Sequence, residues 1–174
     1  MSFARIRQSI DKGARIKTRL DFKKISPDVY KAMLGLEKTA NANGLKALLL
    51  DLVRLRASQI NGCAQCIDMH SKDLRAQGED EQRLYLLNAW REAPFYTERE
   101  RAALAWTEAV TFIADGHVPD AVYGQVRKHF RDAELVNLTL AIVAINGWNR
   151  LNIAFRTVPG TYRAAYRRAS VLYE

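Results

Sequence analysis

The two cysteines of the chain lie only two residues apart, and a histidine follows them closely. Cys63 and Cys66 form a Cys-x-x-Cys motif, and His70 lies four positions after Cys66. The pair Asn61-Gly62 is a turn signal directly before the motif, so the residues after it are predicted to form the first turns of a helix. At 3.6 residues per turn, the two thiols and the imidazole share one helix face within roughly 60° of arc.

This placement favours redox chemistry at the two sulfur atoms. Free backbone N–H groups and the positive end of the helix dipole stabilise a thiolate relative to a thiol. The pKa of a cysteine in such a place can fall from about 8.5 to about 3.5–7.5. Two cysteines at i and i+3 lie within reach of a disulfide, and His70 can take up or return a proton near neutral pH. The spacing therefore predicts a dithiol/disulfide site.

Other sites built on the same residues are weaker interpretations. Cys63, Cys66, His70 and a fourth ligand, Asp51, have a spacing that permits zinc, but a structural zinc usually compensates for a small core, and this chain has long apolar stretches. Covalent haem needs a histidine directly after the second cysteine, where the chain has Ile67. We therefore expect neither a metal nor a cofactor. The β–α–β context of thioredoxins is also missing, which indicates a helical redox protein of another kind.

Asp51 is the one acidic residue in residues 45–57, a stretch that is apolar on nearly all sides. A helix of that kind is buried, and a buried carboxylate must have a partner or a raised pKa. If the stretch packs against the cysteine helix as an antiparallel hairpin, Asp51 can lie beside the thiols and His70. The alternative is an ion pair with a nearby arginine, Arg54 or Arg56. The residues alone leave these two interpretations open.

Hydrophobic periodicity, capping residues and breakers divide the whole chain into helices. No stretch alternates apolar and polar residues as a strand does, and there is no internal repeat. The predicted fold class is therefore all-α, with a two-helix hairpin that carries the cysteines. The expected helices are one from Ser26-Pro27 to the breaker at 41–44, then 45–57, 63–78, 79–90, 97–116 opened by a capping box at Thr97, 119–130, 132–155 capped by Asp132, and a basic closing helix from about Thr161 to Tyr173.

The composition is that of a soluble globular protein with one domain. Of the 174 residues, 48% are hydrophobic and 26% are charged. No apolar run reaches the roughly 18 residues that span a bilayer, so no membrane is expected as a partner. The N-terminus lacks the continuous apolar segment of a secretory signal. We therefore expect a cytoplasmic protein, in a compartment that keeps thiols reduced.

The net charge of +8 is concentrated at the two ends of the chain. Residues 1–24 contain eight Lys and Arg against two Asp, and residues 150–174 contain five Arg against one Glu. The middle of the chain, which holds the cysteines, is slightly acidic, so nucleic acid is not an expected partner. We interpret residues 1–24 as a basic N-terminal arm and residues 25–174 as one helical domain.

The remaining aromatic and polar candidates indicate less. His117 and His129 are interpreted as surface residues. The stretch from Asn146 to Arg150 is unusual inside an apolar helix, and its side-chain amides could bridge subunits. Three tryptophans at helical spacing are typical of core or interface positions: Trp90, Trp106 and Trp148.

The residues around the motif resemble the AhpD-like alkylhydroperoxidases of the carboxymuconolactone decarboxylase superfamily. The resemblance is carried by residues 52–70 and by a specific pattern, an acidic residue twelve positions before a Cys-x-x-Cys-x3-His motif. It continues through residues 81–92, 97–108 and 145–155 and covers most of residues 20–156. It implies an all-helical domain over residues 25–174, no metal or prosthetic group, and a homo-trimer or homo-hexamer built around the buried helices. It also implies reduction of small hydroperoxides, with re-reduction by a lipoyl or thioredoxin-like dithiol.

The same resemblance implies a role for each site residue. By position, Cys66 corresponds to the peroxidatic thiolate, Cys63 to the resolving cysteine and His70 to the proton relay. Asp51 lies where the family has glutamate, and Gln65 lies where its founding members have a histidine between the cysteines.

Two other functions remain open from the sequence. One is a decarboxylase or lactone-processing enzyme of the same superfamily, which has no need of the cysteine pair. The other is a redox-sensing oligomer without catalysis, in which the cysteine pair changes the state of assembly.

Overall fold

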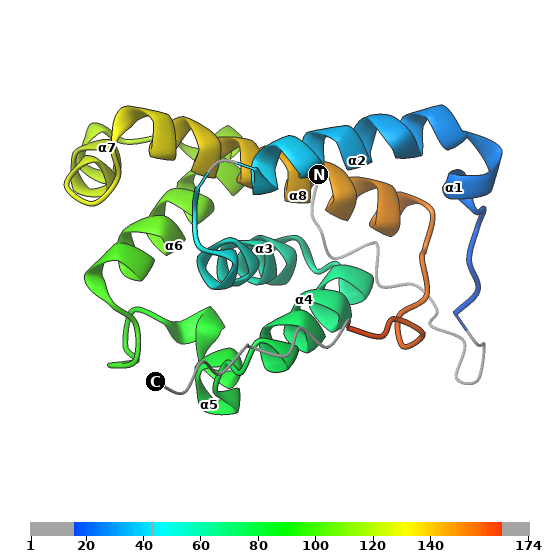
Figure 1. Ribbon diagram of the computed structural model, residues 1–174, viewed down its shortest axis with the longest axis horizontal. Coiled ribbons are helices and arrows are strands. Elements are labelled where there is room, and N and C mark those ends of the chain that lie inside the picture. Colours follow the sequence, from blue (N-terminus) through cyan, green and yellow to red (C-terminus); the bar gives the residue numbers. More distant parts are fainter. Residues whose placement is uncertain (1–15, 43, 165–174) are drawn as a thin grey trace, which may run out of the picture.

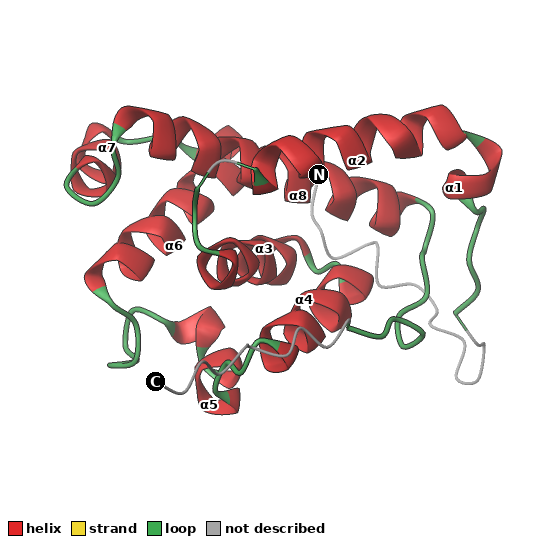
Figure 2. Ribbon diagram, in the orientation of Figure 1, coloured by secondary structure: helices red, strands yellow, loops and turns green. Residues whose placement is uncertain are grey.

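Helices make up all of the regular secondary structure in the part of the chain that the structure describes (Figure 2). The structure is a computed structural model, and it describes residues 16–42 and 44–164. It confirms the predicted all-α fold class. In chain order the α-helices and 3₁₀ helices (η) are α1 Phe22–Ile25, α2 Pro27–Asn41, α3 Ala47–Asn61, α4 Ala64–Ala76, α5 Glu81–Tyr85, η2 Leu87–Ala89, α6 Glu98–Thr111, η3 Ile113–Asp115, α7 Asp120–Arg127 and α8 Asp132–Ala154.

Helix α3 is the element around which the other helices pack. Helices α4, α6 and α8 all contact it, and α2 runs along α8 (Figure 1). The sequence of α3 explains this position, because its side chains are buried on nearly every side. Those exposed by 2% or less include Leu50, Leu52, Val53 and Leu55.

The hairpin of α3 and α4 forms as predicted, but α3 extends one turn further than the sequence suggests. Residues 58–62 were expected to be a turn, yet the helix continues to Asn61 and ends at Gly62, whose φ of 70° is left-handed. The polar residues do not break the helix, because Ser58 donates to the Arg54 carbonyl at 2.7 Å and Asn61 donates to the Ala57 carbonyl at 3.0 Å. Glycine is suited to the left-handed position that ends a helix.

Two of the predicted helix starts are confirmed. Pro27 is the first residue of α2, after Ser26 at the N-cap. At α6, the Thr97 hydroxyl accepts the Glu100 N–H at 3.3 Å, and the Glu100 carboxylate accepts the Thr97 N–H at 2.7 Å. This is the predicted capping box, which satisfies two N–H groups that would otherwise lack partners.

The single helix expected over residues 79–90 is wrong, because the segment splits into α5 and η2. Leu84, Leu87 and Trp90 recur every third residue, and all three are buried. A 3₁₀ turn has three residues per turn and places such residues on the same side. Packing of this stripe therefore favours the tighter helix after Leu86.

The start of α8 also differs from the prediction. Asp132 was expected to cap it, but Arg131 is the N-cap residue, and its N–H donates to the Glu134 carboxylate at 2.9 Å. Asp132 is the first helical residue and pairs with Arg127. At the other end of the chain, residues 161–164 are not helical, so the closing helix does not begin at Thr161; its remaining residues lie outside the described part.

Residues 16–24 of the predicted N-terminal arm contact the helical body. The Arg19 N–H donates to the Phe155 carbonyl at 2.9 Å, and the rings of Phe22 and Phe155 lie 5.7 Å apart. Residues 1–15 lie outside the described residues, so the division into an arm and a domain stays a prediction. Within the described ranges, no helix combines the length and hydrophobicity needed to cross a membrane.

Candidate active site

The two thiols lie where α3 ends and α4 begins. Cys63 is the N-cap residue of α4, and its N–H donates to the Ser58 carbonyl at 3.0 Å. Cys66 lies in the first turn of α4. Both side chains are free thiols that are only 1% exposed. The sulfurs therefore lie at a helix N-terminus, as the sequence predicts, but they are buried more deeply than a surface turn would place them.

An apolar cluster surrounds the two sulfurs, and helix α8 supplies its polar contact. Ala57, Ile145 and the partly buried Trp148 complete this cluster around the cysteines. From α8, the Asn152 amide nitrogen donates to the Cys66 Sγ atom at 3.4 Å. Burial disfavours a thiolate, whereas an N–H donor favours it, so the environment contains opposing effects on the same sulfur.

The contact between the two thiols separates their pKa values. The contact with Cys66 lowers the pKa of Cys63, and the contact with Cys63, together with burial, raises the pKa of Cys66. Two sulfurs this close do not both ionise, so the pair holds one negative charge and one S–H that donates to it. The dithiol therefore loses its first proton at a lowered pKa and retains the second.

Asp51 lies within the site and has both of the contacts that the sequence left open. Its carboxylate accepts from Arg54 Nη1 at 3.0 Å and from Gln77 Nε2 at 2.6 Å, and its Oδ1 atom lies 3.6 Å from His70 Nδ1. Burial raises the pKa of Asp51, but His70, Arg54 and Gln77 together lower it below its ordinary value. Asp51 is therefore a carboxylate at neutral pH. Arg56, the other proposed partner, pairs with Glu108 instead.

The imidazole of His70 is buried, and its nitrogens have no hydrogen-bond partner among the described residues. His70 is 5% exposed, and both of its ring nitrogens, Nδ1 and Nε2, are buried. The 3.6 Å contact with Asp51 is longer than a hydrogen bond of ordinary length. His70 is thus held near a carboxylate, and neither nitrogen is committed to a hydrogen bond among the described residues.

A cavity of about 550 Å³ connects these groups. Cys66, His70 and Asp51 all line it, whereas Cys63 does not. The imidazole and the Cys66 thiol therefore face a common space, which is what their shared helix face predicts. The apolar part of the wall includes Leu34, Leu45, Leu50, Met69 and Trp148.

A buried arginine supports the polar side of the cavity. The Arg54 guanidinium contacts the Glu37 carboxylate at 2.5 Å and the Asn41 amide oxygen at 2.6 Å, in addition to Asp51. Its Nε atom is buried and has no partner in the described ranges. One arginine thereby pairs with two carboxylates, from α2 and α3, which fixes Asp51 in its orientation towards His70.

The segment after α8 closes one side of the cavity. It is held on α4 by three contacts: Gly160 N–H donates to Asp68 at 3.1 Å, Lys72 donates to the Tyr162 carbonyl at 3.3 Å, and the Tyr162 hydroxyl donates to Asp73 at 2.6 Å. Burial and the contact with Asp73 raise the pKa of Tyr162, so it stays a neutral phenol. Its ring is part of the cavity wall.

The geometry gives no support to the zinc alternative. Within residues 16–42 and 44–164, no three His, Cys, Asp or Glu side chains are placed to hold a metal ion. Asp51 is already engaged by Arg54 and Gln77, and the two sulfurs interact with each other.

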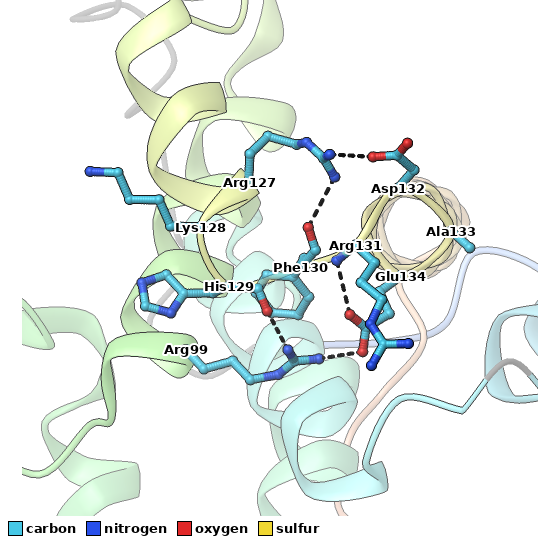
Figure 3. A pocket seen from close by; sticks show the side chains of 9 residues that line it. All are labelled: Arg99, Arg127, Lys128, His129, Phe130, Arg131, Asp132, Ala133 and Glu134. Atoms are coloured by element: carbon cyan, nitrogen blue, oxygen red, sulfur yellow. Dashed lines mark hydrogen bonds and ion pairs between the residues drawn. The ribbon is translucent and has the colours of Figure 1, made fainter.

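The other histidines lie away from the thiols. His117 is exposed in the loop after η3, in agreement with the prediction. His129 is half-buried and lines a second pocket, of about 700 Å³, at the junction of α7 and α8 (Figure 3). Both carboxylates of that pocket are paired, because Arg99 binds Glu134 at 2.8 Å and Arg127 binds Asp132. It has no nucleophile and is not a candidate for redox chemistry.

No role at the thiols was predicted from the sequence for two amides of α8. Asn152 donates to Cys66 Sγ at 3.4 Å, and Asn149 lowers the pKa of both cysteines. Asn61 donates to both Asn146 and Asn149, at 2.9 and 2.8 Å. Their spacing of three residues along one apolar helix was the signal that could have identified them. Gln77 gave no such signal.

Comparison with known proteins gives a family and two close relatives. Residues 27–109 match the model of the carboxymuconolactone decarboxylase family. The uncharacterized protein YdfG of Bacillus subtilis (strain 168) is 43% identical over 136 residues, which are 78% of this chain and 92% of that protein. A protein of unknown function from Agrobacterium tumefaciens, described as a possible antioxidant defence protein AhpD, has 46% identity and a TM-score of 0.81. The match covers 84% of this chain and all of that one.

A more distant solved structure shares the fold. It is an uncharacterized peroxidase-related protein from Ralstonia eutropha JMP134, described as having an alkylhydroperoxidase AhpD core. It has a TM-score of 0.70 and 19% identity, over 80% of this chain and 74% of that chain. The predicted resemblance of fold is therefore confirmed.

Proposed function

Because the chain belongs to the AhpD-like proteins of the carboxymuconolactone decarboxylase superfamily, we propose that it is a thiol-dependent peroxidase. It reduces a small hydroperoxide through a dithiol/disulfide cycle of Cys66 and Cys63. The main support for this proposal is the position of Cys66, a buried free thiol that faces the same cavity as His70 and Asp51. The second thiol lies directly behind it, outside the cavity wall.

The first step uses the charge shared by the two sulfurs. Cys63, whose pKa is lowered by its contact with Cys66, carries the negative charge at rest. When a hydroperoxide enters the cavity, the Cys66 S–H gives its proton to Cys63, and the Cys66 thiolate attacks the terminal peroxide oxygen. An S–O bond forms and the O–O bond breaks, so the sulfur loses two electrons and the peroxide gains them. The products are a sulfenic acid on Cys66 and an alkoxide, which takes a proton to become an alcohol.

The second step forms the disulfide. The Cys63 sulfur attacks the sulfenic sulfur of Cys66, the S–S bond forms, the S–O bond breaks and water leaves. An external dithiol of the lipoyl or thioredoxin-like class then reopens the disulfide by exchange and becomes a disulfide itself. The cysteines are thereby restored, and one hydroperoxide is consumed for each dithiol.

His70 supplies the proton for the leaving oxygen. The residue lines the cavity, and its nitrogens have no hydrogen-bond partner among the described residues, so we assign it as the group that binds a hydroperoxide or a bridging water. Asp51 is ionised at neutral pH, so it stabilises the imidazolium form that gives the proton. The apolar wall of leucines, methionine and tryptophan suits an organic hydroperoxide better than a strongly charged one.

Lengthening the acid tests the relay. We expect Asp51→Glu to raise the hydroperoxide reduction rate severalfold, because one more methylene can bring the carboxylate from 3.6 Å into hydrogen-bond distance of His70. Asp51→Asn, which keeps the shape and removes the charge, should lower the rate by roughly tenfold, part of the 10²- to 10⁴-fold effect of a general acid–base group. Steady-state assays of both variants at neutral pH measure this. Equal rates in all three proteins would exclude Asp51 from the relay.

Access to the cavity is expected to depend on Tyr162. Replacement by alanine removes part of the cavity wall, so a bulky maleimide should modify Cys66 severalfold faster. Tyr162→Phe keeps the ring and loses only the hydrogen bond to Asp73, so its rate should stay close to that of the unmodified protein. An unchanged rate in the alanine variant would show that the cavity opens elsewhere.

The functional proposal is tested by a reductant-dependent hydroperoxide assay with several dithiol donors. Alkylation of the thiols should abolish hydroperoxide reduction by a peroxidase. A decarboxylase or lactone-processing enzyme of the same superfamily would keep its own activity after the same treatment. A purely redox-sensing oligomer would consume no hydroperoxide and would change its size on reduction. Gel filtration with and without reductant checks that outcome and also tests the proposed homo-trimer or homo-hexamer. A cytoplasmic location remains part of the proposal, since the cycle needs a reducing compartment.

A further inference from the structure

Two asparagines of α8 lie against the cysteine pair in fixed orientations. Asn149 and Asn152 are three residues apart on α8 and therefore share a helix face, and α8 contacts α4. An asparagine amide can present either an N–H donor or a carbonyl acceptor to a neighbour. The other hydrogen-bond partners of each amide determine whether its N–H donor or its carbonyl acceptor faces the sulfurs.

The partners of Asn152 place its nitrogen on the Cys66 sulfur. The Nδ2 atom donates to the Trp148 carbonyl, one turn back on the same helix, at 3.0 Å and to Cys66 Sγ at 3.4 Å. A backbone carbonyl only accepts, so it requires the NH₂ group on this side of the amide. The second hydrogen of the same NH₂ group then points to the sulfur. The side chain also lines the cavity that Cys66 faces.

A chain of hydrogen bonds also orients Asn149 with its amide nitrogen towards the cysteines. Its oxygen accepts from Asn61 Nδ2 at 2.8 Å, and its nitrogen donates to the Ser58 hydroxyl at 3.1 Å. Ser58 has already given its own proton to the Arg54 carbonyl at 2.7 Å, so it can only accept from Asn149. The Asn149 nitrogen therefore faces the cysteines, where it lowers the pKa of both thiols.

We propose that Asn152 is a catalytic residue, a hydrogen-bond donor that holds the negative charge of Cys66 when this sulfur attacks, and that Asn149 positions the pair from behind. This inference rests on the proposed peroxidase function and adds a group to its mechanism. Apolar side chains pack around the sulfurs, Asn149 and Asn152 are the side-chain amides that act on Cys66, and neither nitrogen of His70 bonds to a sulfur in the described residues. Asn152 thus supplies the N–H that a buried thiolate requires.

A donor of this kind has two opposite effects on the rate. A hydrogen bond to a charged group is worth roughly a factor of ten, so losing it should raise the thiol pKa by about one. Below that pKa, the thiolate fraction falls about tenfold, but each thiolate becomes about threefold more nucleophilic, since nucleophilicity rises with pKa with a slope of about 0.4–0.5. The net expectation is about threefold slower reaction at low pH and about threefold faster reaction at high pH.

The test is the pH dependence of Cys66 alkylation by iodoacetamide, with Cys63 replaced by serine so that a single thiol reacts. We expect Asn152→Leu to move the profile to higher pH and to cross that of the parent protein. Asn152→Asp, which keeps the size of the side chain and replaces the donor by a carboxylate, should move it further. Asn137→Leu is the matched control, the same substitution about four turns earlier on α8, and should leave the profile unchanged.

Profiles without a shift or crossing in both Asn152 variants would overturn the proposal, as would an equal shift in the Asn137 control. Alkylation involves no peroxide, so it is independent of the proposed function. If the unmodified protein reduced no hydroperoxide while the profiles still crossed, the peroxidase function would fail and the donor contact of Asn152 with the thiolate would stand.

Discussion

Replacement of Cys66 by serine is expected to abolish hydroperoxide reduction. The alcohol is not ionised near neutral pH and cannot form the sulfenic acid or the disulfide, so no step of the cycle remains. The substitution changes one atom in the buried cluster of Ala57, Cys63 and Ile145, and the fold should be kept. The measurement is reductant-dependent consumption of a hydroperoxide, compared with the unmodified protein at equal concentration and matched circular dichroism.

Cys63→Ser is the companion variant and should behave differently. Its Cys66 thiol still faces the cavity, so it should react once with a hydroperoxide and stop at the sulfenic acid. A reagent selective for sulfenic acids should then label Cys66 in this variant and should not label the Cys66→Ser variant. Full turnover in both variants would remove the cysteines from the mechanism. A sulfenic acid labelled on Cys63 in the Cys66→Ser variant would show that the two cysteines have the opposite roles.

Loss of Arg54 is expected to have the largest effect on stability. Asp51 and Glu37 both bind this guanidinium, whose side chain is 6% exposed, and Arg54→Leu would leave two carboxylates without their cation. Removal of one partner of a buried ion pair costs about 3–5 kcal/mol in the free energy of unfolding. Urea denaturation of the two proteins measures the difference. Lys31→Leu, which removes an exposed ion pair with Asp28, is the control and should change stability by less than about 0.5 kcal/mol.

The stability deficit of Arg54→Leu should depend on pH in a predictable direction. In the unmodified protein the pKa of Asp51 is lowered, so its ionised form stabilises the fold above the unfolded pKa, and this contribution is lost as pH falls through the folded value. In the variant one of the groups that lower the pKa of Asp51 is gone, so its folded pKa is higher than in the unmodified protein. The part of the deficit that comes from this difference is complete at neutral pH and is lost as pH falls through the two folded pKa values. A deficit that stays constant from neutral pH down to the pH at which Asp51 is protonated in both folded proteins would exclude this origin.

The local parts of the site could be predicted from the sequence, because short-range spacing determines them. Cys63 is the N-cap residue of α4, and Cys66 and His70 lie in the same helix. The Asn61-Gly62 turn signal marks where this helix begins. Helical periodicity therefore placed Cys66 and His70 on one face, and both line one cavity. The buried position of Asp51 followed from the apolar helix around it.

The contacts between distant segments could not be predicted in the same way. Asn152 is 86 residues from Cys66, and Tyr162 is 89 residues from Asp73. Such contacts depend on how α8 and the segment after it pack on α4, which no local pattern specifies. Asp51 also has two partners at once, although the sequence presented them as alternatives, because a carboxylate has enough lone pairs for Arg54 and for His70. The split at Leu86 has a similar origin, since burial of side chains three residues apart determined the helix type.

The dithiol/disulfide cycle is decided by peptide mapping of the reduced protein after addition of one equivalent of a small organic hydroperoxide. We expect an intramolecular disulfide between Cys63 and Cys66, with one alcohol formed for each disulfide, and loss of this disulfide on addition of a dithiol. Recovery of both cysteines as free thiols, with the hydroperoxide unconsumed, would exclude the cycle.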